Sequence, residues 1–364
     1  MSSSFGQIVK ISLFGESHGP GVGMVIDGLP SGIAIDEKEM RSALAKRKPY
    51  GKISTSRIEE DEVEFLSGVF GGYTTGSPVC FIIRNRNTDD SSYPYGRVRP
   101  SHADWTAEIK YRGFEDYRGG GHFSGRLTAP LVVLGAICSK ELRKRGILVG
   151  THIAEIGGIS DEPWDEKKLE DQIRSVDEKR FAAIDEVAER RMIECIENAK
   201  KEKDSVGGVL STAIAHLPAG LGEPFFDSVE SVLSHLIFSL GGVKGILFGD
   251  GCRFASLKGS EANDGLYYRE DGEIGFYSNH NGGINGGISN GQTIFFDTVI
   301  KPTPSIGKMQ KSIDFVKKEN IDLEIVGRHD PCIVHRIRSA VDALTCYGIY
   351  DLLLTDEARN GKRV

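Results

Sequence analysis

The sequence predicts an α+β fold in a single large domain, residues 1–364, with an internal pseudo-twofold duplication. Three observations lead to this prediction. Short apolar runs typical of strands alternate with amphipathic segments typical of helices. Glycine clusters flank the apolar runs. Two segments of the first half also recur in the second half, in the same order.

The expected strands follow from the 45 glycines, which lie in clusters beside apolar runs. Because glycine adopts positive φ without strain, such clusters are typical of tight turns. The runs VCFII and TIFFDTVI, residues 79–83 and 293–300, are two of the strands expected beside them. The glycine clusters occupy residues 15–23, 68–76, 117–125 and 280–291.

Three amphipathic segments are expected to form helices between the strands. Two of them are residues 35–47 and 125–145. The third, roughly residues 177–204, carries apolar residues at helical spacing among many opposite charges. The alternation of these helices with strands favours the α+β class.

An internal repeat relates the two halves of the chain. Residues 16–32 align without gaps on residues 204–220. Both segments begin with acid–Ser–x–Gly, continue with an apolar stretch and end in Leu-Pro-small-Gly. Further on, residues 71–85 resemble residues 286–300.

Two units in the same order suggest an ancient duplication within one domain. The units cover approximately residues 5–150 and 195–345. Chance similarity between glycine-rich segments is the alternative. Within the repeat, Ser17 recurs as Ser205, whereas the position of His18 holds Val206. His18 is therefore the expected functional departure.

The first glycine cluster also matches a serine-hydrolase pattern. Gly15–Gly19 reads G-x-S-x-G, and Ser17 would be the nucleophile, with His329 and Asp330 as partners. That pattern needs a strand before it and a helix after it. Only about a dozen residues precede it here, and a proline and a glycine follow, so a hydrolase is not expected.

Composition and missing patterns exclude several classes of protein. A formal net charge of −7 argues against a general nucleic-acid binder. No apolar run is long enough to span a membrane, and the N-terminus lacks a secretory signal. The six scattered cysteines predict free thiols and a cytoplasmic location. No pattern for ATP, a Rossmann dinucleotide or a metal is present.

Three further clusters bring histidine and arginine together. They occupy residues 97–105, 116–126 and 327–338. Arginine donates bidentate hydrogen bonds to carboxylates and phosphates, and glycine-rich turns let backbone N–H groups approach an anion. Histidine exchanges protons near neutral pH. Together the clusters predict a site for a small ligand with several negative charges.

Seven motifs together resemble the chorismate synthase family. They lie in the family's order and span the chain from residue 5 to about residue 345. The resemblance implies a β-α-β sandwich with internal duplication, usually assembled as a homotetramer. The motifs are FGESHG, RPSHAD, DYRGGGxxSxR, LPAGLGEPFFD, SNHNGGINGGIS, KPTPSI and GRHDPC.

The resemblance implies the last step of the shikimate route. 5-Enolpyruvylshikimate 3-phosphate loses phosphate and its C6 proton in a 1,4-anti elimination that gives chorismate. Reduced FMN is required without net redox change. An external flavin reductase is its expected source, and NADPH enters only indirectly as the source of reduction.

The resemblance also implies the residues of the site. His18 is expected to act as a general acid toward the departing phosphate. His102 is expected to protonate the reduced flavin or stabilise its anionic form. Ser17 and Asp330 would form a relay near flavin N5, with the flavin accepting the C6 proton. The implied substrate anchors are Arg47, Lys52, Arg99, Arg126 and Arg336, with Lys52 in place of a family arginine.

Several implied flavin contacts depart from the commoner family pattern. His122 and Phe123 replace arginine and serine, and Gly241–Gly242 replaces Asn-Ala. The implied contacts are His122, Phe123, Ser124, Gly241, Gly242, Gly286, Lys301, Pro302, Thr303, Pro304, Ser305 and Arg328. The alternative function is a flavin- or anion-binding relative without lyase activity. The presence of the four implied catalytic residues argues against it.

Overall fold

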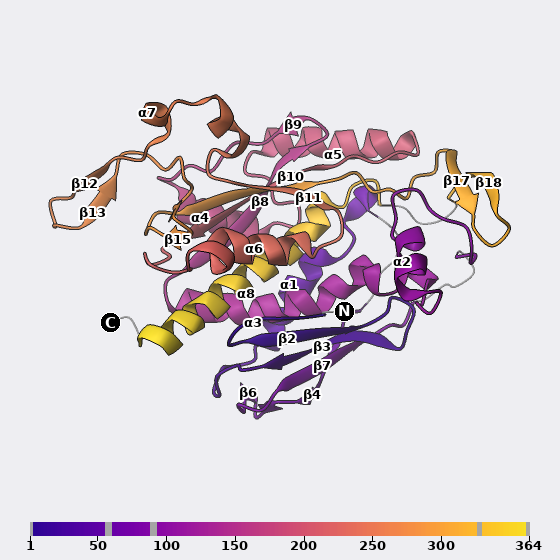
Figure 1. The fold of residues 1–364 in the computed structure, drawn as a ribbon, viewed down its shortest axis with the longest axis horizontal. Coiled ribbons are helices and arrows are strands. Elements are labelled where there is room, and N and C mark those ends of the chain that lie inside the picture. Colours follow the sequence, from indigo (N-terminus) through magenta and orange to yellow (C-terminus); the bar gives the residue numbers. More distant parts are fainter. Residues whose placement is uncertain (1–2, 55–59, 88–92, 326–329, 362–364) are drawn as a thin grey trace.

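The computed structural model describes residues 3–54, 60–87, 93–325 and 330–361 (Figure 1). Two five-stranded antiparallel sheets enclose a layer of helices. The predicted α+β class is therefore confirmed.

The first sheet comes from the N-terminal half of the chain. Its central strand is buried along nearly its whole length, because the apolar run VGMVI lies at the middle of the sheet. A short hairpin, β5 (Val69–Phe70) and β6 (Tyr73–Thr74), precedes the fourth strand in the sheet. In spatial order the strands are β1 (Ser4–Phe5), β2 (Lys10–Gly15), β3 (Gly21–Asp27), β7 (Val79–Arg84) and β4 (Val63–Ser67).

The second sheet comes from the C-terminal half, with two strands from the middle of the chain. In spatial order its strands are β9 (Ile159–Ser160), β8 (Leu148–Ile156), β10 (Gly208–Ala215), β16 (Ile294–Ile300) and β11 (Val243–Phe248). Three small hairpins extend from it: β12 (Leu266–Tyr268) with β13 (Ile274–Phe276), β14 (Ile284–Asn285) with β15 (Ile288–Ser289), and β17 (Gln310–Asp314) with β18 (Glu319–Leu323).

Segments that align in the sequence occupy equivalent strands. β3 and β10 lie in the first pair of aligned segments, and each is the central strand of its sheet. Each also pairs with the strand from the second aligned segment, β7 or β16. Later in the chain, after shorter elements, a long central helix comes after β7 in the first half, and another comes after β16 in the second half.

The helical layer is built around α3 (Thr128–Lys144) and α8 (Val334–Asn360). α3 contacts the first sheet, α8 contacts the second, and the two helices pack on each other. Gly135 permits this contact, because a Cβ there would lie 2.3 Å from the Cα and Cβ of Ala343. α1 (Glu37–Arg47) and α6 (Val229–Phe238) complete the layer.

The remaining helices lie outside this layer. The charged segment at 177–204 forms one main helix, α5 (Glu186–Lys201), which begins where Asp185 accepts a hydrogen bond from the N–H of Ala188. α4 (Leu169–Glu178) packs on the second sheet. The short elements are α2 (Asp104–Tyr111), α7 (Gly259–Ala262) and the 3-10 turns η1 (Gly51–Ile53), η3 (Arg118–Phe123), η4 (Gly125–Leu127), η5 (Phe225–Asp227) and η6 (Gly251–Ser256).

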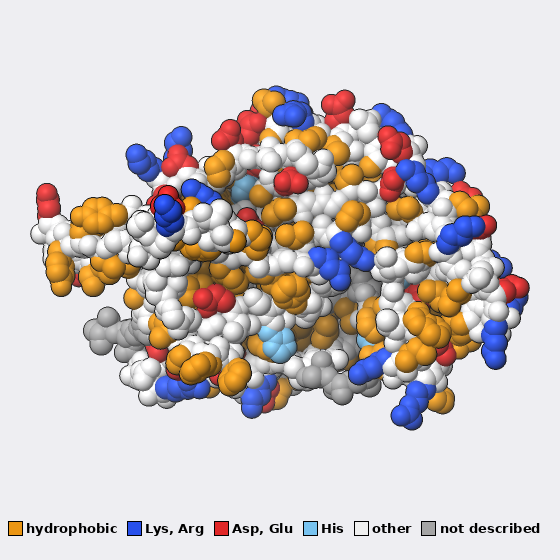
Figure 2. All heavy atoms as spheres, turned by 45° about the horizontal axis from the view of Figure 1, so that its top comes forward, with side chains coloured by type: hydrophobic (Ala, Val, Ile, Leu, Met, Phe, Trp, Pro, Cys, Tyr) orange, Lys and Arg blue, Asp and Glu red, His pale blue; other side chains and the backbone are white. Residues whose placement is uncertain are grey.

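An arm formed by β12, β13 and α7 projects from the body of the protein (Figure 1). Hydrophobic side chains lie along this arm (Figure 2), and Leu266, Tyr268, Ile274 and Tyr277, on and beside its hairpin, are all strongly exposed. None of the helices within the described ranges is both long and apolar enough to cross a bilayer. All six cysteines lie within those ranges as free thiols.

The contact between α3 and α8 generates a prediction about stability. Gly135→Ala should lower the free energy of unfolding by about 1–3 kcal/mol, because overpacking separates the helices. Alanine is the better helix former by ~1 kcal/mol, so the loss must exceed that gain. Denaturant unfolding at matched protein concentration measures it. Gly259→Ala is the control, because a Cβ at Gly259 meets no atom within 4 Å. Equal stability of the two variants would contradict the prediction.

Candidate active site

The centre of the site is the contact between two glycine-rich turns. One is the turn from β2 to β3, which carries Ser17 and His18, and the other is η3. The N–H of Ser17 donates to the carbonyl of Gly121 (3.0 Å). Gly119 has φ +61° and lies against His18, so a Cβ there would be 2.4 Å from the imidazole ring. Only glycine suits both this backbone conformation and this close approach.

The structure rejects the serine-hydrolase interpretation. Ser17 lies between two antiparallel strands, so no helix follows it. Its Oγ is fully buried and has no hydrogen-bond partner among the described residues. His329, the proposed base, lies outside the described residues, as does Arg328.

Acid–arginine pairs surround His18. The ring of Tyr93 meets the imidazole edge-on at 5.3 Å, and the guanidinium of Arg99 lies 5.3 Å from the same tyrosine ring. Arg99 forms a bidentate pair with Asp104, at 2.9 and 2.7 Å. Burial opposes ionisation of Asp104, but the hydrogen bonds and charge of Arg99 outweigh it and lower the pKa of Asp104.

A second pair approaches His18 from η3. Asp116 accepts two hydrogen bonds from the guanidinium of Arg118, both 2.8 Å. These bonds lower the pKa of Asp116, and the charge of His18 contributes in the same direction. His18 therefore faces a carboxylate that stays ionised near neutral pH.

His102 connects the first half of the chain to the KPTPSI segment. Its Nε2 is 2.7 Å from the Oγ of Ser305. Lys301 donates from Nζ to the carbonyl of Ser101 (2.9 Å) and from its N–H to the carbonyl of Gly242 (2.9 Å). The structure thus brings together residues that are some 200 positions apart in the sequence.

The KPTPSI segment has the features of an anion site. Burial lowers the pKa of Lys301, and the charge of Lys244 lowers it further. A nearby anion would relieve this repulsion. The Oγ1 of Thr303 is buried without a hydrogen-bond partner among the described residues, although the carbonyl of Thr303 accepts from Ser205 (2.6 Å).

Two of the expected anchors, Arg47 and Arg126, are buried beside each other. Both pair with the carboxylate of Asp61, Arg47 at 3.4 Å. Arg47 also donates from Nε to the Oγ1 of Thr128 (2.7 Å). Arg336 reaches the same place, because its Nε donates to the carbonyl of Arg47 (3.0 Å) and its NH1 pairs with Asp330.

The other expected residues occupy varied positions. His122 is 2.9 Å from the hydroxyl of Tyr111 and stacks on Phe123, whose side chain is half exposed. Ser124 accepts a hydrogen bond from the N–H of Arg126 (3.3 Å). Lys52 lies exposed on η1.

Gly286 lies apart from the remaining expected flavin contacts. Gly287, beside it, accepts a hydrogen bond from Val229 at the start of α6. Gly241 and Gly242 follow the other end of α6. A ten-residue helix is about 15 Å long, so one chain does not bring Gly286 to Gly242. Its role stays a prediction.

A family model described as chorismate synthase matches residues 9–354. The chain belongs to the chorismate synthase family. A chorismate synthase from Dehalococcoides mccartyi is 44% identical over 357 residues, covering 97% of each chain. One from Korarchaeum cryptofilum is 40% identical, covering 96% of this chain and 97% of the relative.

A solved structure supports the same fold. A crystal structure of chorismate synthase superimposes with a TM-score of 0.75 at 24% identity, covering 97% of this chain and 93% of that one. With relatives above 40% identity along nearly the full length, the function is that of a chorismate synthase, a lyase of the shikimate pathway.

Within this chorismate synthase fold, three polar residues near the site were missed by the sequence analysis. Asp116 lies inside a recognised motif but was not assigned a role. Asn85 directly follows β7, and Asp61 lies in the acidic run EEDE, which is typical of a solvated surface. No local pattern distinguishes Asp61 from its neighbours, because its burial results from tertiary contacts.

His335 lies in a cluster that was expected to bind an anionic ligand and exchange protons, but the structure gives this histidine a different environment. It is buried, and its Nε2 contacts the Oγ of Ser54 (2.8 Å). Burial lowers the pKa of His335 to about 3, and the charges of Arg336 and Arg180 add to the effect. His335 is therefore neutral near pH 7 and structural.

The close approach of Gly119 to His18 generates a prediction about activity. Gly119→Ala should lower kcat by about 10²-fold, because displacing a reacting group by ~1 Å has such an effect. Gly120→Ala is the matched control: Gly120 also has positive φ, but a Cβ there comes only within 3.9 Å of Arg99. Steady-state assays of both variants measure the difference, and equal kcat values would contradict the prediction.

The buried His335 generates a prediction about pH. The unfolded chain takes up a proton at this position below about pH 6.5, whereas the folded chain does not until about pH 3. Stability should therefore fall as the pH decreases through this window, by roughly 2 kcal/mol between pH 7 and pH 5 from this group.

His335→Gln should remove that contribution, so its unfolding free energy should depend less on pH than that of the wild type. Denaturant unfolding at pH 7 and pH 5 measures the change. His216→Gln replaces an exposed histidine and is the control. An unchanged pH dependence in His335→Gln would refute the assignment.

Proposed function

We propose that this site carries out the 1,4-anti elimination of phosphate from 5-enolpyruvylshikimate 3-phosphate to give chorismate, with reduced FMN and no net redox change. The observation that carries the proposal is the contact of the His18 turn with η3, beside converging arginines. The substrate has two carboxylates and a phosphate. Arginine binds such groups in bidentate fashion.

The described residues fit reduced FMN. Ser17 Oγ and Thr303 Oγ1 are buried polar atoms that have no hydrogen-bond partner among the described residues. The positive charges of Lys301 and Lys244 lie close enough to interact, which suits a phosphate. When bound, reduced FMN supplies electron density to the reaction. The proposed contacts are His122, Phe123, Ser124, Gly241, Gly242, Gly286, Lys301, Pro302, Thr303, Pro304, Ser305 and Arg328.

The arginines are proposed to orient the substrate. Arg99 and Arg336 are partly exposed and each is held by an acid, so their positions are fixed before binding. Arg47 and Arg126 share one carboxylate, which leaves a net positive charge for an anion. Lys52, exposed on η1, adds a further cation.

His18 is proposed as the general acid that delivers a proton to the departing phosphate. The carboxylate of Asp116, whose pKa is lowered by its hydrogen bonds to Arg118, places a negative charge near His18. His102, whose Nε2 lies 2.7 Å from the Oγ of Ser305, would hold a proton for the reduced flavin. Ser17 and Asp330 are proposed as the proton relay.

The assembly and partners are further parts of the proposal. The equivalent strand orders of the two sheets support an ancient duplication, with units near residues 5–150 and 195–345. The apolar arm supports self-association as a homotetramer. The reduced FMN would come from an external flavin reductase, with NADPH only as its electron source. The free thiols support a cytoplasmic location.

The reaction can be tested directly. The protein is incubated anaerobically with the enolpyruvyl substrate and chemically reduced FMN, and phosphate release and chorismate absorbance are followed. Activity with NADPH and FMN alone would argue against an external reductase. Binding of FMN without phosphate release would leave a flavin-binding relative and reject the proposed reaction.

His18→Ala should lower turnover by roughly 10²–10⁴-fold at saturating reduced FMN, because the general acid is lost. His216→Ala, which removes an exposed histidine paired with Glu170, is the control and should be unaffected. An unchanged rate in His18→Ala would remove His18 from the mechanism.

A further inference from the structure

A continuous series of hydrogen bonds and ion pairs links the His18 turn to the buried arginines. It begins at Asn85, which follows the end of β7. The Nδ2 of Asn85 donates to the carbonyls of Glu16 (2.9 Å) and Gly19 (2.8 Å), on either side of Ser17 and His18. Its backbone N–H donates to the carbonyl of Pro20 (3.2 Å). One asparagine therefore holds the turn at three carbonyls.

The same side chain continues the series to Arg126. The Oδ1 of Asn85 accepts a hydrogen bond from Arg126 Nε (3.0 Å). The guanidinium also donates from NH2 to the carbonyl of Arg84 (3.2 Å) and pairs through NH1 with Asp61. Only 4% of the Arg126 side chain is exposed, so its orientation is set by these contacts.

Asp61 connects Arg126 to Arg47. Its side chain is 1% exposed and its carboxylate contacts both guanidiniums. Its φ of 54° lies in the left-handed region, which costs about 1 kcal/mol for a residue other than glycine. The two ion pairs offset this free-energy cost. They form only when the carboxylate of Asp61 points inward, and this backbone conformation holds it there.

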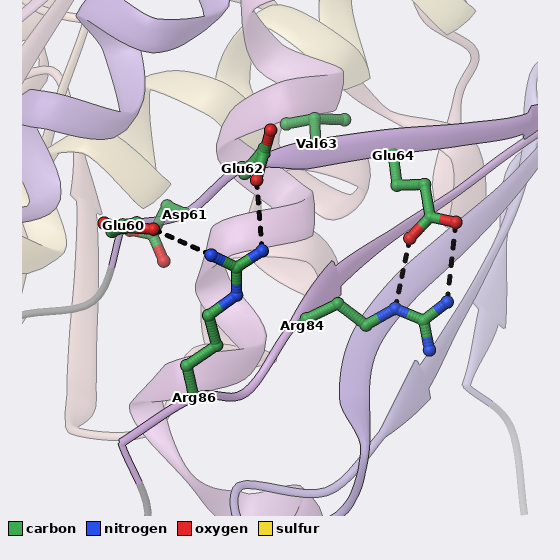
Figure 3. Close-up of a pocket in the computed structure, with 7 residues that line it drawn as sticks. All are labelled: Glu60, Asp61, Glu62, Val63, Glu64, Arg84 and Arg86. Carbon is green, nitrogen blue, oxygen red and sulfur yellow. Dashed lines mark hydrogen bonds and ion pairs between the residues drawn. The ribbon is translucent and has the colours of Figure 1, made fainter.

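The neighbours of Asp61 make different contacts. They line a pocket of about 270 Å³ formed by Glu60, Asp61, Glu62, Val63, Glu64, Arg84 and Arg86. At its surface Arg86 pairs with Glu60 and Glu62, and Arg84 pairs with Glu64 (Figure 3). These acids are largely exposed, whereas Asp61 binds the arginines beneath.

We propose that Asn85 and Asp61 are positioning residues for the reaction. Together they hold Arg126 between the His18 turn and Arg47, so that the proton donor and the anion-binding arginines keep a fixed spacing. The inference rests on the proposed function, in which His18 is the general acid and these arginines bind the substrate. Neither Asn85 nor Asp61 itself contacts the reacting atoms.

The two ends of the series should affect different kinetic constants. Asn85→Asp keeps an acceptor for Arg126 but loses both donors to the turn, so it should mainly displace His18. Asp61→Asn keeps the shape but removes the shared negative charge, so it should mainly release Arg126 and Arg47. A merely structural role would lower the apparent kcat in proportion to the folded fraction and leave KM unchanged, so each kcat is divided by the folded fraction measured at the assay temperature.

The test measures kcat and KM for the enolpyruvyl substrate with saturating, chemically reduced FMN. Asn85→Asp should lower kcat at least about tenfold with KM changed less than about threefold. Asp61→Asn should raise KM at least about tenfold. Glu62→Gln is the matched control, because it removes the same charge from the surface of the same pocket, and both constants should stay as in the wild type.

Several outcomes would overturn the inference. Unchanged constants in both variants would reject it, and so would kcat changes that follow only the thermal unfolding midpoint. A lower KM in Asp61→Asn would show that Asp61 competes with the substrate. If Asn85→Asp fails to fold, Asn85→Ser, which also removes the two Nδ2 donors to the turn, replaces it; if Asp61→Asn fails to fold, Asp61→Ser, which also removes the shared charge, replaces it, each with the same expected direction. An inactive wild type would reject the proposed reaction, whereas an active wild type with unaffected variants would reject the positioning roles alone.

Discussion

The close packing of α3 against α8 is the constraint on which the rest of the molecule depends. Each helix covers one sheet, so their separation sets the distance between the two sheets. Gly135 allows the backbones to approach at Ala343. The same contact positions the site, because Arg126 and Thr128 lie at the start of α3, and Arg336 lies in the first turn of α8. Helix N-termini favour anions, so both helices direct partial positive charge toward the arginines.

The two glycine-rich turns at the site illustrate a different constraint. Ser17 and His18 are buried, yet the proposed function requires their side chains to remain available to ligands. A side chain larger than hydrogen at Gly119 would occupy the space of the imidazole. Glycine thus lets the turn approach closely, and Asn85 holds it from the other side through backbone carbonyls. The turn is fixed mainly by backbone contacts, which leaves its side chains for chemistry.

Local patterns predicted the elements of this fold well, because hydrophobic periodicity reports directly on burial in strands and helices. β7, β16, α1 and α3 lie where the apolar runs and amphipathic segments predicted them, and the motifs named His18 and His102 as candidate site residues. Position in the fold was harder to predict. Asp61 looks like its exposed neighbours, and His335 looks like an acid–base residue until its burial is known. Both depend on long-range contacts, which no local pattern encodes.

Charge distribution explains how an acidic protein can bind a polyanion. The net charge of −7 is spread over exposed acids such as Glu60 and Glu62, which pair with surface arginines. At the site, in contrast, two buried guanidiniums share the single carboxylate of Asp61. If each arginine had its own acid, the pairs would carry no net charge to attract an anion. Without any acid, two like charges would be buried in contact. One shared carboxylate holds both guanidiniums in place and leaves one net positive charge for the proposed ligand. In the proposed function, the position of Asp61 is therefore as important to anion binding as the arginines themselves.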